Sequence, residues 1–318
     1  MQKTFARYAG VVLAFNLAVI LWGAFVRTSG SGAGCGNHWP LCNGVVVPQA
    51  PVVATIIEFT HRAMSGIDVV LVVALLVWAF RAFPRRHPVR LGATLSAVFL
   101  ASEALIGALL VKLEHVARNA SVGRAYSLSG HLMNTLTLLA CLTLTIWWAS
   151  GGGRLRLRGR AAWLAVPGLL LFVVLGISGV IAALGDTLFP ARSLAEGFRQ
   201  DFDPAASIFL RLRLLHPMLA VGTAAWLWFY AGIQRRQAAW PAGSLMALVA
   251  LQIGAGVLNL LLLAPEWMQI LHLLLADLVW ISLVWLCAST LRGPGVPADS
   301  RSDEMAPRVR GLERVGPK

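Results

Sequence analysis

Charged side chains are scarce in this sequence. Asp, Glu, Lys and Arg together make up 13% of its 318 residues, whereas soluble globular domains carry about 25%. Apolar residues make up 58%, and the mean hydropathy is +0.71. This composition excludes an ordinary soluble domain and indicates a chain that lies mostly in lipid.

Acidic residues are scarcer than basic ones, 14 against 27, so the formal net charge is +13. The basic residues gather in short stretches without Asp or Glu, at 81–90, 154–160 and 235–236, and in the tail after residue 292. Nucleic-acid binding needs a folded basic surface, which this distribution does not provide. The sequence therefore predicts no nucleic-acid partner.

Apolar runs of about 20 residues, the length that crosses a hydrocarbon core as a helix, recur along the chain. They lie at 9–26, 60–80, 91–111, 128–149, 161–184, 208–232, 241–263 and 270–291. We therefore expect an all-α membrane protein with eight transmembrane helices.

The arginine-rich stretches follow the second, fourth and sixth runs. Because Lys and Arg near span ends resist translocation, that side is predicted to be cytoplasmic. The chain is then expected to cross a bacterial inner membrane, with both termini in the cytoplasm. The first run lacks the small-residue cleavage site of a secretory signal, so we expect a retained helix. The tail at 293–318 is rich in Pro, Gly and charge and is predicted to be a disordered cytoplasmic end.

The chain has only four cysteines. Cys35 and Cys42 share the first outer loop, where an oxidising compartment favours a disulfide between them. The alternative is a metal site that includes His38, although two thiols and one imidazole leave a tetrahedral ligand set incomplete. Cys141 and Cys287 fall within apolar runs and are typical of small buried hydrophobes.

The second half of the chain repeats features of the first half. Gly23 to Gly32 matches Gly176 to Gly185 in the first span of each half, and the other three spans match at single residues. These matching pairs are His61 with His216, Glu103 with Gln252, and His131 with His272. The order predicts two pseudo-symmetric four-helix bundles, 1–150 and 151–292, related by an axis along the membrane normal.

All four of these histidines are expected near the outer boundary, one pair in each half. A lone histidine at membrane depth often satisfies only a helix–helix hydrogen bond, whereas four at duplicated positions indicate function. Haem iron accepts two histidine ligands from facing helices, while zinc or copper needs further ligands that do not recur here. The pattern favours two bis-histidine haem sites, with iron held by His61, His131, His216 and His272.

Small and basic residues accompany these histidines. Glycines could let helices pass a flat macrocycle, or could serve plain close packing. Arginines could bind haem propionates, or could reach lipid phosphate instead. The glycines are Gly66, Gly107, Gly123, Gly130, Gly222 and Gly256, and the arginines are Arg27, Arg62, Arg211 and Arg213.

The stretch GAFVRTSGSGAGCGNHWPLCNG from Gly23 to Gly44, followed by Glu58-x-x-His61-Arg62, resembles the haem A synthase family. The resemblance covers 9–291. It implies oxidation of the C8 methyl group of haem O to the formyl group of haem A, for haem-copper terminal oxidases. It also implies that the first half holds haem O as substrate and the second half holds haem B.

Two departures from the family pattern stand out. Some relatives carry a second cysteine pair between the fifth and sixth spans, and 185–207 has none. The third span more commonly has Gln where this chain has Glu103, which places an extra titratable group near the first site.

Haem O synthase, a membrane electron acceptor and a second copy of the chain are the partners to consider beyond haem O and the lipid bilayer.

The two halves differ in charge beside their histidines. Aligning His61 with His216 sets Glu58 opposite Arg213, and only the carboxylate can take up a proton. We therefore expect catalysis from Glu58, His61 and His131, and binding of the resident haem by His216, His272 and Arg213. The alternative for Glu58 is a salt bridge with Arg62 or Arg27.

Two other functions compete with the synthase. A dihaem cytochrome that transfers quinol electrons also explains the histidines, but transfer across the membrane favours haems at two depths. A transporter built from repeats explains the intramembrane carboxylates Asp68, Glu103 and Asp277, but not the paired histidines and cysteines.

Overall fold

The computed structural model describes residues 1–292, where the regular elements are helices and eight spans are long and apolar enough to cross a membrane. The predicted all-α membrane protein with eight spans is confirmed. The predicted disordered tail, 293–318, lies outside the described residues. The helices are α1 (Gln2–Thr28), α2 (Val53–Ala82), α3 (Pro88–Lys112), α4 (Val122–Ala149), α5 (Gly159–Leu188), α6 (Leu194–Phe202), α7 (Ile208–Arg213), α8 (Leu215–Gln234), α9 (Ala239–Leu261) and α10 (Glu266–Thr290).

Several helices begin before the apolar run that predicted them. α2 begins at Val53 and α4 at Val122, whereas the runs begin at 60 and 128. At α4, the Ser121 hydroxyl accepts a hydrogen bond of 3.2 Å from the Arg124 backbone N–H. This cap satisfies one of the free donors at a helix start, so the helix extends into polar sequence.

The sixth span is broken rather than continuous. α7 ends at Arg213, α8 begins at Leu215, and Leu214 joins them. Pro217 accounts for the break, because proline has no backbone N–H and its ring clashes with the carbonyl four residues earlier, here that of Arg213. The short helix α6 precedes this span and was not predicted from hydropathy, since its sequence alternates charged and apolar residues.

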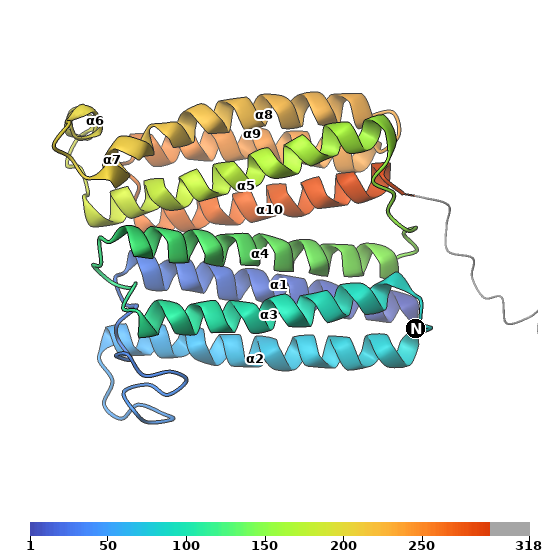
Figure 1. Ribbon diagram of the computed structural model, residues 1–318, viewed down its shortest axis with the longest axis horizontal. Coiled ribbons are helices and arrows are strands. Elements are labelled where there is room, and N and C mark those ends of the chain that lie inside the picture. The colour runs from blue at the N-terminus through green and yellow to red at the C-terminus, as the bar shows by residue number, and fades with distance from the viewer. Residues whose placement is uncertain (293–318) are drawn as a thin grey trace, which may run out of the picture.

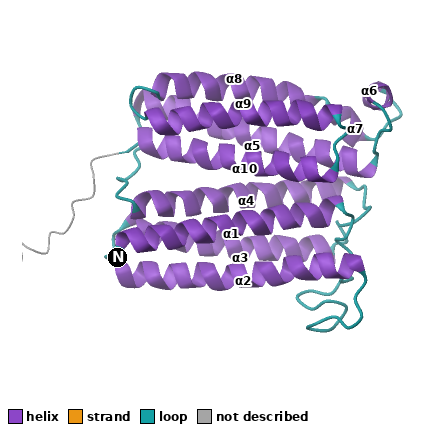
Figure 2. Ribbon diagram, turned by 180° about the vertical axis from the view of Figure 1, so that it is seen from behind, coloured by secondary structure: helices purple, strands orange, loops and turns teal. Residues whose placement is uncertain are grey.

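The spans fall into two groups in space. α1 to α4 lie together on one side of the molecule and α5, α8, α9 and α10 on the other (Figures 1 and 2). α4 packs against α5 and α10, and α1 also contacts α10. The Trp280 indole donates a 2.7 Å hydrogen bond to the Leu136 carbonyl across this boundary. That the two groups are pseudo-symmetric copies stays a prediction.

The ends of the molecule differ in what they carry. The N-terminus lies at one end, and the loop between α1 and α2, together with α6, lies at the other (Figures 1 and 2). Many side chains along the spans, such as Val70 and Leu251, are apolar and exposed. Because lipid is as apolar as these side chains, the exposed surface fits a bilayer, and close packing holds the helices together.

Candidate functional site

The four predicted histidines lie at similar depths in their spans. His61 on α2, His131 on α4, His216 on α8 and His272 on α10 each follow the start of the span by about two helical turns. The histidines therefore lie further from the helix starts than the first few residues that the sequence indicated. Their matching depth agrees with the predicted duplication.

Each histidine ring faces a glycine on the transmembrane span that precedes its own in the sequence. A Cβ atom added at Gly23 of α1 would lie 3.0 Å from Cε1 of His61, and one added at Gly179 of α5 would lie 3.1 Å from Cε1 of His216. These glycines occupy corresponding helices of the two halves. A larger side chain at either position would displace the ring.

The fourth span of each half has the same arrangement. A Cβ atom at Gly256 of α9 would lie 3.1 Å from Cε1 of His272, and one at Gly107 of α3 would lie 3.8 Å from Nε2 of His131. Gly107 and Gly256 therefore lie beside two of the predicted histidine ligands.

Other predicted glycines lie elsewhere. A Cβ atom at Gly66, Gly130 or Gly222 would meet no other atom within 4 Å, and one at Gly123 would meet His115. None of these four glycines contacts one of the four histidines, and whether they lie beside a bound macrocycle stays a prediction. Gly179, rather than the aligned Gly176, matches Gly23. The sequence separation from Gly23 to Gly179 nearly equals that from His61 to His216, and this spacing could have revealed the match.

The second histidine pair is close enough to share one ligand. The ring centroids of His216 and His272 are 6.4 Å apart and the ring planes are 85° apart. Ser178 lies 3.0 Å from Nδ1 of His216, and Gln252 Nε2 lies 3.3 Å from Nε2 of His272. Nδ1 of His272 is buried without a hydrogen-bond partner.

The first pair has an acidic partner. Oε1 of Glu103 lies 2.8 Å from Nδ1 of His131. The sequence indicated only that Glu103 was a titratable group near this site. The structure adds that its carboxylate bonds directly to one of the two predicted iron ligands. Nδ1 of His61 is buried without a hydrogen-bond partner.

These features fit a pair of haem groups. Two imidazoles from facing helices match the ligand set that haem iron accepts, and the glycines keep space beside the rings. Buried ring nitrogens without partners are groups that a bound ligand can satisfy. Within residues 1–292, no group of three or more His, Cys, Asp or Glu side chains is placed to hold a bare metal ion.

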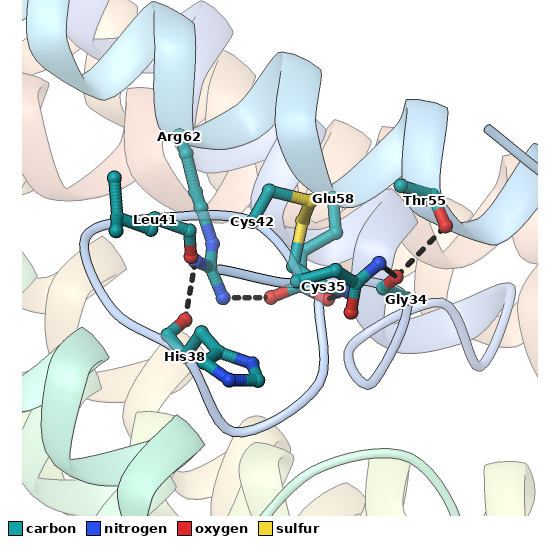
Figure 3. Close-up of a disulfide and its surroundings, with 9 residues drawn as sticks. Gly34, Cys35, His38, Leu41, Cys42, Thr55, Glu58 and Arg62 are labelled. Atoms are coloured by element: carbon teal, nitrogen blue, oxygen red, sulfur yellow. Dashed lines mark hydrogen bonds and ion pairs between the residues drawn. A yellow bond between two sulfur atoms is a disulfide. The ribbon is translucent and has the colours of Figure 1, made fainter. Parts of the chain in front are cut away.

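Glu58 contacts the outer loop. Cys35 and Cys42 form the predicted disulfide, which excludes the alternative metal site with His38. The Glu58 side chain is buried and accepts a 2.9 Å hydrogen bond from the Cys35 backbone N–H. Its other oxygen forms a 2.5 Å salt bridge with Arg62 (Figure 3). These contacts match the salt-bridge alternative, and a role of Glu58 in proton transfer stays a prediction.

Arg62 and Thr55 complete this anchor. Arg62 donates hydrogen bonds of 2.7 Å and 2.6 Å to the carbonyls of His38 and Leu41. The Thr55 hydroxyl donates one of 2.8 Å to the Gly34 carbonyl (Figure 3). The start of α2 therefore holds the disulfide loop over one end of the first half.

The predicted propionate-binding arginines have protein partners. Arg213 forms salt bridges of 2.7 Å with Asp186 and with Asp201. Arg27 of α1 donates hydrogen bonds of 2.9 Å to Thr187 of α5 and 3.0 Å to Gln269 of α10. Arg27 therefore also ties the first half to the second, a role that the sequence did not indicate.

Comparison with known proteins gives a consistent family. The sequence model of the family described as cytochrome oxidase assembly protein matches residues 6–284. Two proteins named heme A synthase are similar over part of the chain. One, from Geobacillus kaustophilus, is 40% identical over 111 residues, 35% of each chain. The other, from Bacillus licheniformis, is 44% identical over 95 residues, 30% of this chain and 31% of that protein.

A longer match carries a different name. A Thermus thermophilus protein named protoheme IX farnesyltransferase is 50% identical over 293 residues, which cover 90% of this chain and 48% of that protein. This chain therefore spans about half the length of that relative.

Proposed function

We propose that this chain, which belongs to the cytochrome oxidase assembly protein family, oxidises the C8 methyl group of haem O to the formyl group of haem A. The observation that carries the proposal is the duplicated pair of histidines at one depth, each ring against a glycine. We infer the reaction from the similarity to relatives named heme A synthase.

The reaction has a definite balance. A methyl group and one water molecule become a formyl group, four protons and four electrons. When bound, haem supplies a path through iron for the electrons, which pass to a membrane electron acceptor. The chain itself must bind the porphyrin, orient it, limit access of water and receive protons.

The two halves divide this work. Residues 1–150 hold haem O through His61 and His131, and residues 151–292 hold haem B through His216 and His272. The charges beside the pairs support this assignment, because Glu58 and Glu103 belong to the first half and their counterparts are Arg213 and Gln252. Carboxylates can handle protons, whereas a guanidinium and an amide cannot at working pH.

Arg213 belongs to the second site in this proposal. Its salt bridges with Asp186 and Asp201 fix the guanidinium in position beside α8. Glu58 is the proposed proton acceptor, and its burial under the disulfide loop separates it from bulk water.

The proposed orientation puts both termini in the cytoplasm of a bacterial cell. Arginine-rich loops after α2, α4 and α8 support it through the positive-inside rule. The disulfide loop then faces the oxidising side, where such bonds persist. Haem O synthase as the supplier of substrate, and a second copy of the chain, complete the proposed partners.

The name of the Thermus relative raises prenyl transfer as a second function. Prenyl diphosphates are generally bound through Mg²⁺ held by carboxylates. Within the described residues no group of three or more His, Cys, Asp or Glu side chains could hold a metal ion. This chain covers 48% of the Thermus relative, and the production assay below separates the two functions.

A production assay tests the proposal. Cells that make haem O but lack their own haem A synthase should accumulate haem A when they express this chain, as measured by mass spectrometry of extracted haems. A His61→Leu variant should make none. Well-expressed protein that leaves haem O unchanged would contradict the proposal and favour a dihaem cytochrome, and haem O made without any haem O synthase would favour prenyl transfer.

A further inference from the structure

The fourth-span histidines of the two halves have different partners. In the first half, the Glu103 carboxylate lies 2.8 Å from Nδ1 of His131. In the second half, the aligned residue Gln252 places its amide nitrogen 3.3 Å from Nε2 of His272. One ring is therefore bonded to an acid through Nδ1, and the other to a neutral amide through the opposite nitrogen.

Glu103 is held firmly by its neighbours. Asn134 donates a 2.5 Å hydrogen bond to Oε2 and Thr135 donates one of 2.5 Å to Oε1. Asn134 in turn accepts from Ser102 at 2.6 Å and donates to the Phe99 carbonyl at 2.8 Å. With Nδ1 of His131, three polar groups surround the two oxygens, and the Thr135 hydroxyl also lies 2.9 Å from the His131 carbonyl.

We propose that Glu103 is a positioning residue that fixes the His131 ring through Nδ1, leaves Nε2 for iron, and gives the first-half site a lower midpoint potential than the second-half site. The inference rests on the proposed function, because it takes His131 and His272 as iron ligands. It concerns the difference between the halves, which the proposed function does not explain.

The physical reason lies in the charge of the second partner. A carboxylate that accepts the outer N–H of a ligating histidine fixes the ring and makes it a stronger electron donor. A stronger donor stabilises oxidised iron relative to reduced iron, and hydrogen bonding around a haem ligand is one of the means by which a protein tunes potential. Gln252 carries no charge and does not contact Nδ1. The first pair therefore favours oxidised iron more than the second pair does.

A purely structural role is the alternative for Glu103. Its bonds to Asn134 and Thr135 also tie α3 to α4, and loss of these bonds could loosen the helices. Glu103→Gln keeps the length and the hydrogen-bonding capacity of the side chain and removes the charge. Gln252→Glu makes the reciprocal change in the second half. Together they separate an effect of charge from an effect of packing.

The test is a potentiometric titration of full-length purified protein loaded with haem O and haem B. Glu103→Gln should shift the reduction equilibrium of the first-half haem about tenfold toward reduced iron, which raises its midpoint potential by about 59 mV for a one-electron couple. The potential of the second-half haem should not change. Gln252→Glu adds a negative charge beside the second pair without a bond to Nδ1, so it should lower the potential of the second-half haem by less than Glu103→Gln raises that of the first. If Glu103→Gln does not fold, this variant still tests whether a carboxylate at this position lowers the potential.

The outcomes distinguish the two proposals. Haem at both pairs with potentials that neither variant moves would contradict the inference alone. Equal shifts of both haems would also contradict it, because a local charge acts on one site. Protein that binds haem at neither pair would contradict the proposed function, and the inference with it.

Discussion

Glu58 and His61 lie one helical turn apart on α2, yet their side chains meet different parts of the molecule. His61 packs on Gly23 of α1, while Glu58 accepts from the backbone of the disulfide loop and pairs with Arg62. A carboxylate between a histidine ligand and a loop can pass protons outward or can simply hold the loop. Substitution separates the two roles.

Glu58→Gln keeps shape and can retain the bond to Cys35, but removes the group that takes up a proton. We expect the variant to fold and bind both porphyrins, to make at least tenfold less haem A, and to accumulate a hydroxylated intermediate. Mass spectrometry of extracted haems measures both products. Arg62→Gln is the control for anchoring, because it removes the same salt bridge and the Arg62 bonds to the loop but leaves the carboxylate. Normal haem A production by Glu58→Gln would assign Glu58 to anchoring alone.

Residue types and their repeats were enough to find the histidines and the disulfide. His61, His131, His216 and His272 stand out because histidine is costly in lipid and these four recur in order. The bond between Glu103 and His131 could not be predicted, since it depends on how α3 and α4 are rotated about their axes. The contacts of Glu58 were foreseen only as an alternative to a catalytic role.

Glycine pairing makes each histidine-bearing helix depend on its neighbour. Gly256 of α9 lies against His272 of α10, and Gly179 of α5 lies against His216 of α8. Small residues let helices approach closely in a membrane, and here a histidine ring occupies the space beside the glycine. The packing between helices therefore sets the position of the ring.

Gly256→Leu tests this dependence. Its side chain would enter the space of the His272 ring, because even a Cβ atom lies 3.1 Å from Cε1. We expect haem binding at the second site to fall by on the order of tenfold, as measured by haem content per purified chain. Gly254→Leu, on the same helix, is the control, because a Cβ atom there meets nothing within 4 Å. Equal haem content in the two variants would contradict the proposed dependence.

The broken sixth span shows what hydropathy leaves out. The apolar run at 208–232 predicted one helix, and the structure has α7 and α8 meeting at Leu214. Pro217 stood in the sequence as a helix-breaking residue, but hydropathy does not register a missing backbone donor. Similarly, the ends of α2 and α4 depend on caps and loop contacts rather than on apolar length.

At the scale of the whole molecule, the predicted histidine sites lie toward one end. The disulfide loop and α6 lie at that end, and the N-terminus lies at the other (Figures 1 and 2). Under the proposed function, we expect the porphyrin to bind near one membrane surface. The arginine-rich loops predict that this surface is the outer one.

Cysteine labelling tests that orientation. Ala205→Cys lies in the exposed loop between α6 and α7, and Gln237→Cys lies in the exposed loop between α8 and α9. In a background without Cys141 and Cys287, a membrane-impermeant maleimide added to intact cells should label only the first variant. Labelling of the second variant alone would reverse the proposed topology.

The central claim is that two histidine pairs each hold a haem. Pyridine haemochrome analysis of purified protein, with chain concentration from amino-acid analysis, measures haem type and number together. We predict two haems per chain, one of them haem B, and loss of haem B alone in His216→Leu and His272→Leu. Protein without haem, or an unchanged haem content in both variants, would contradict the claim.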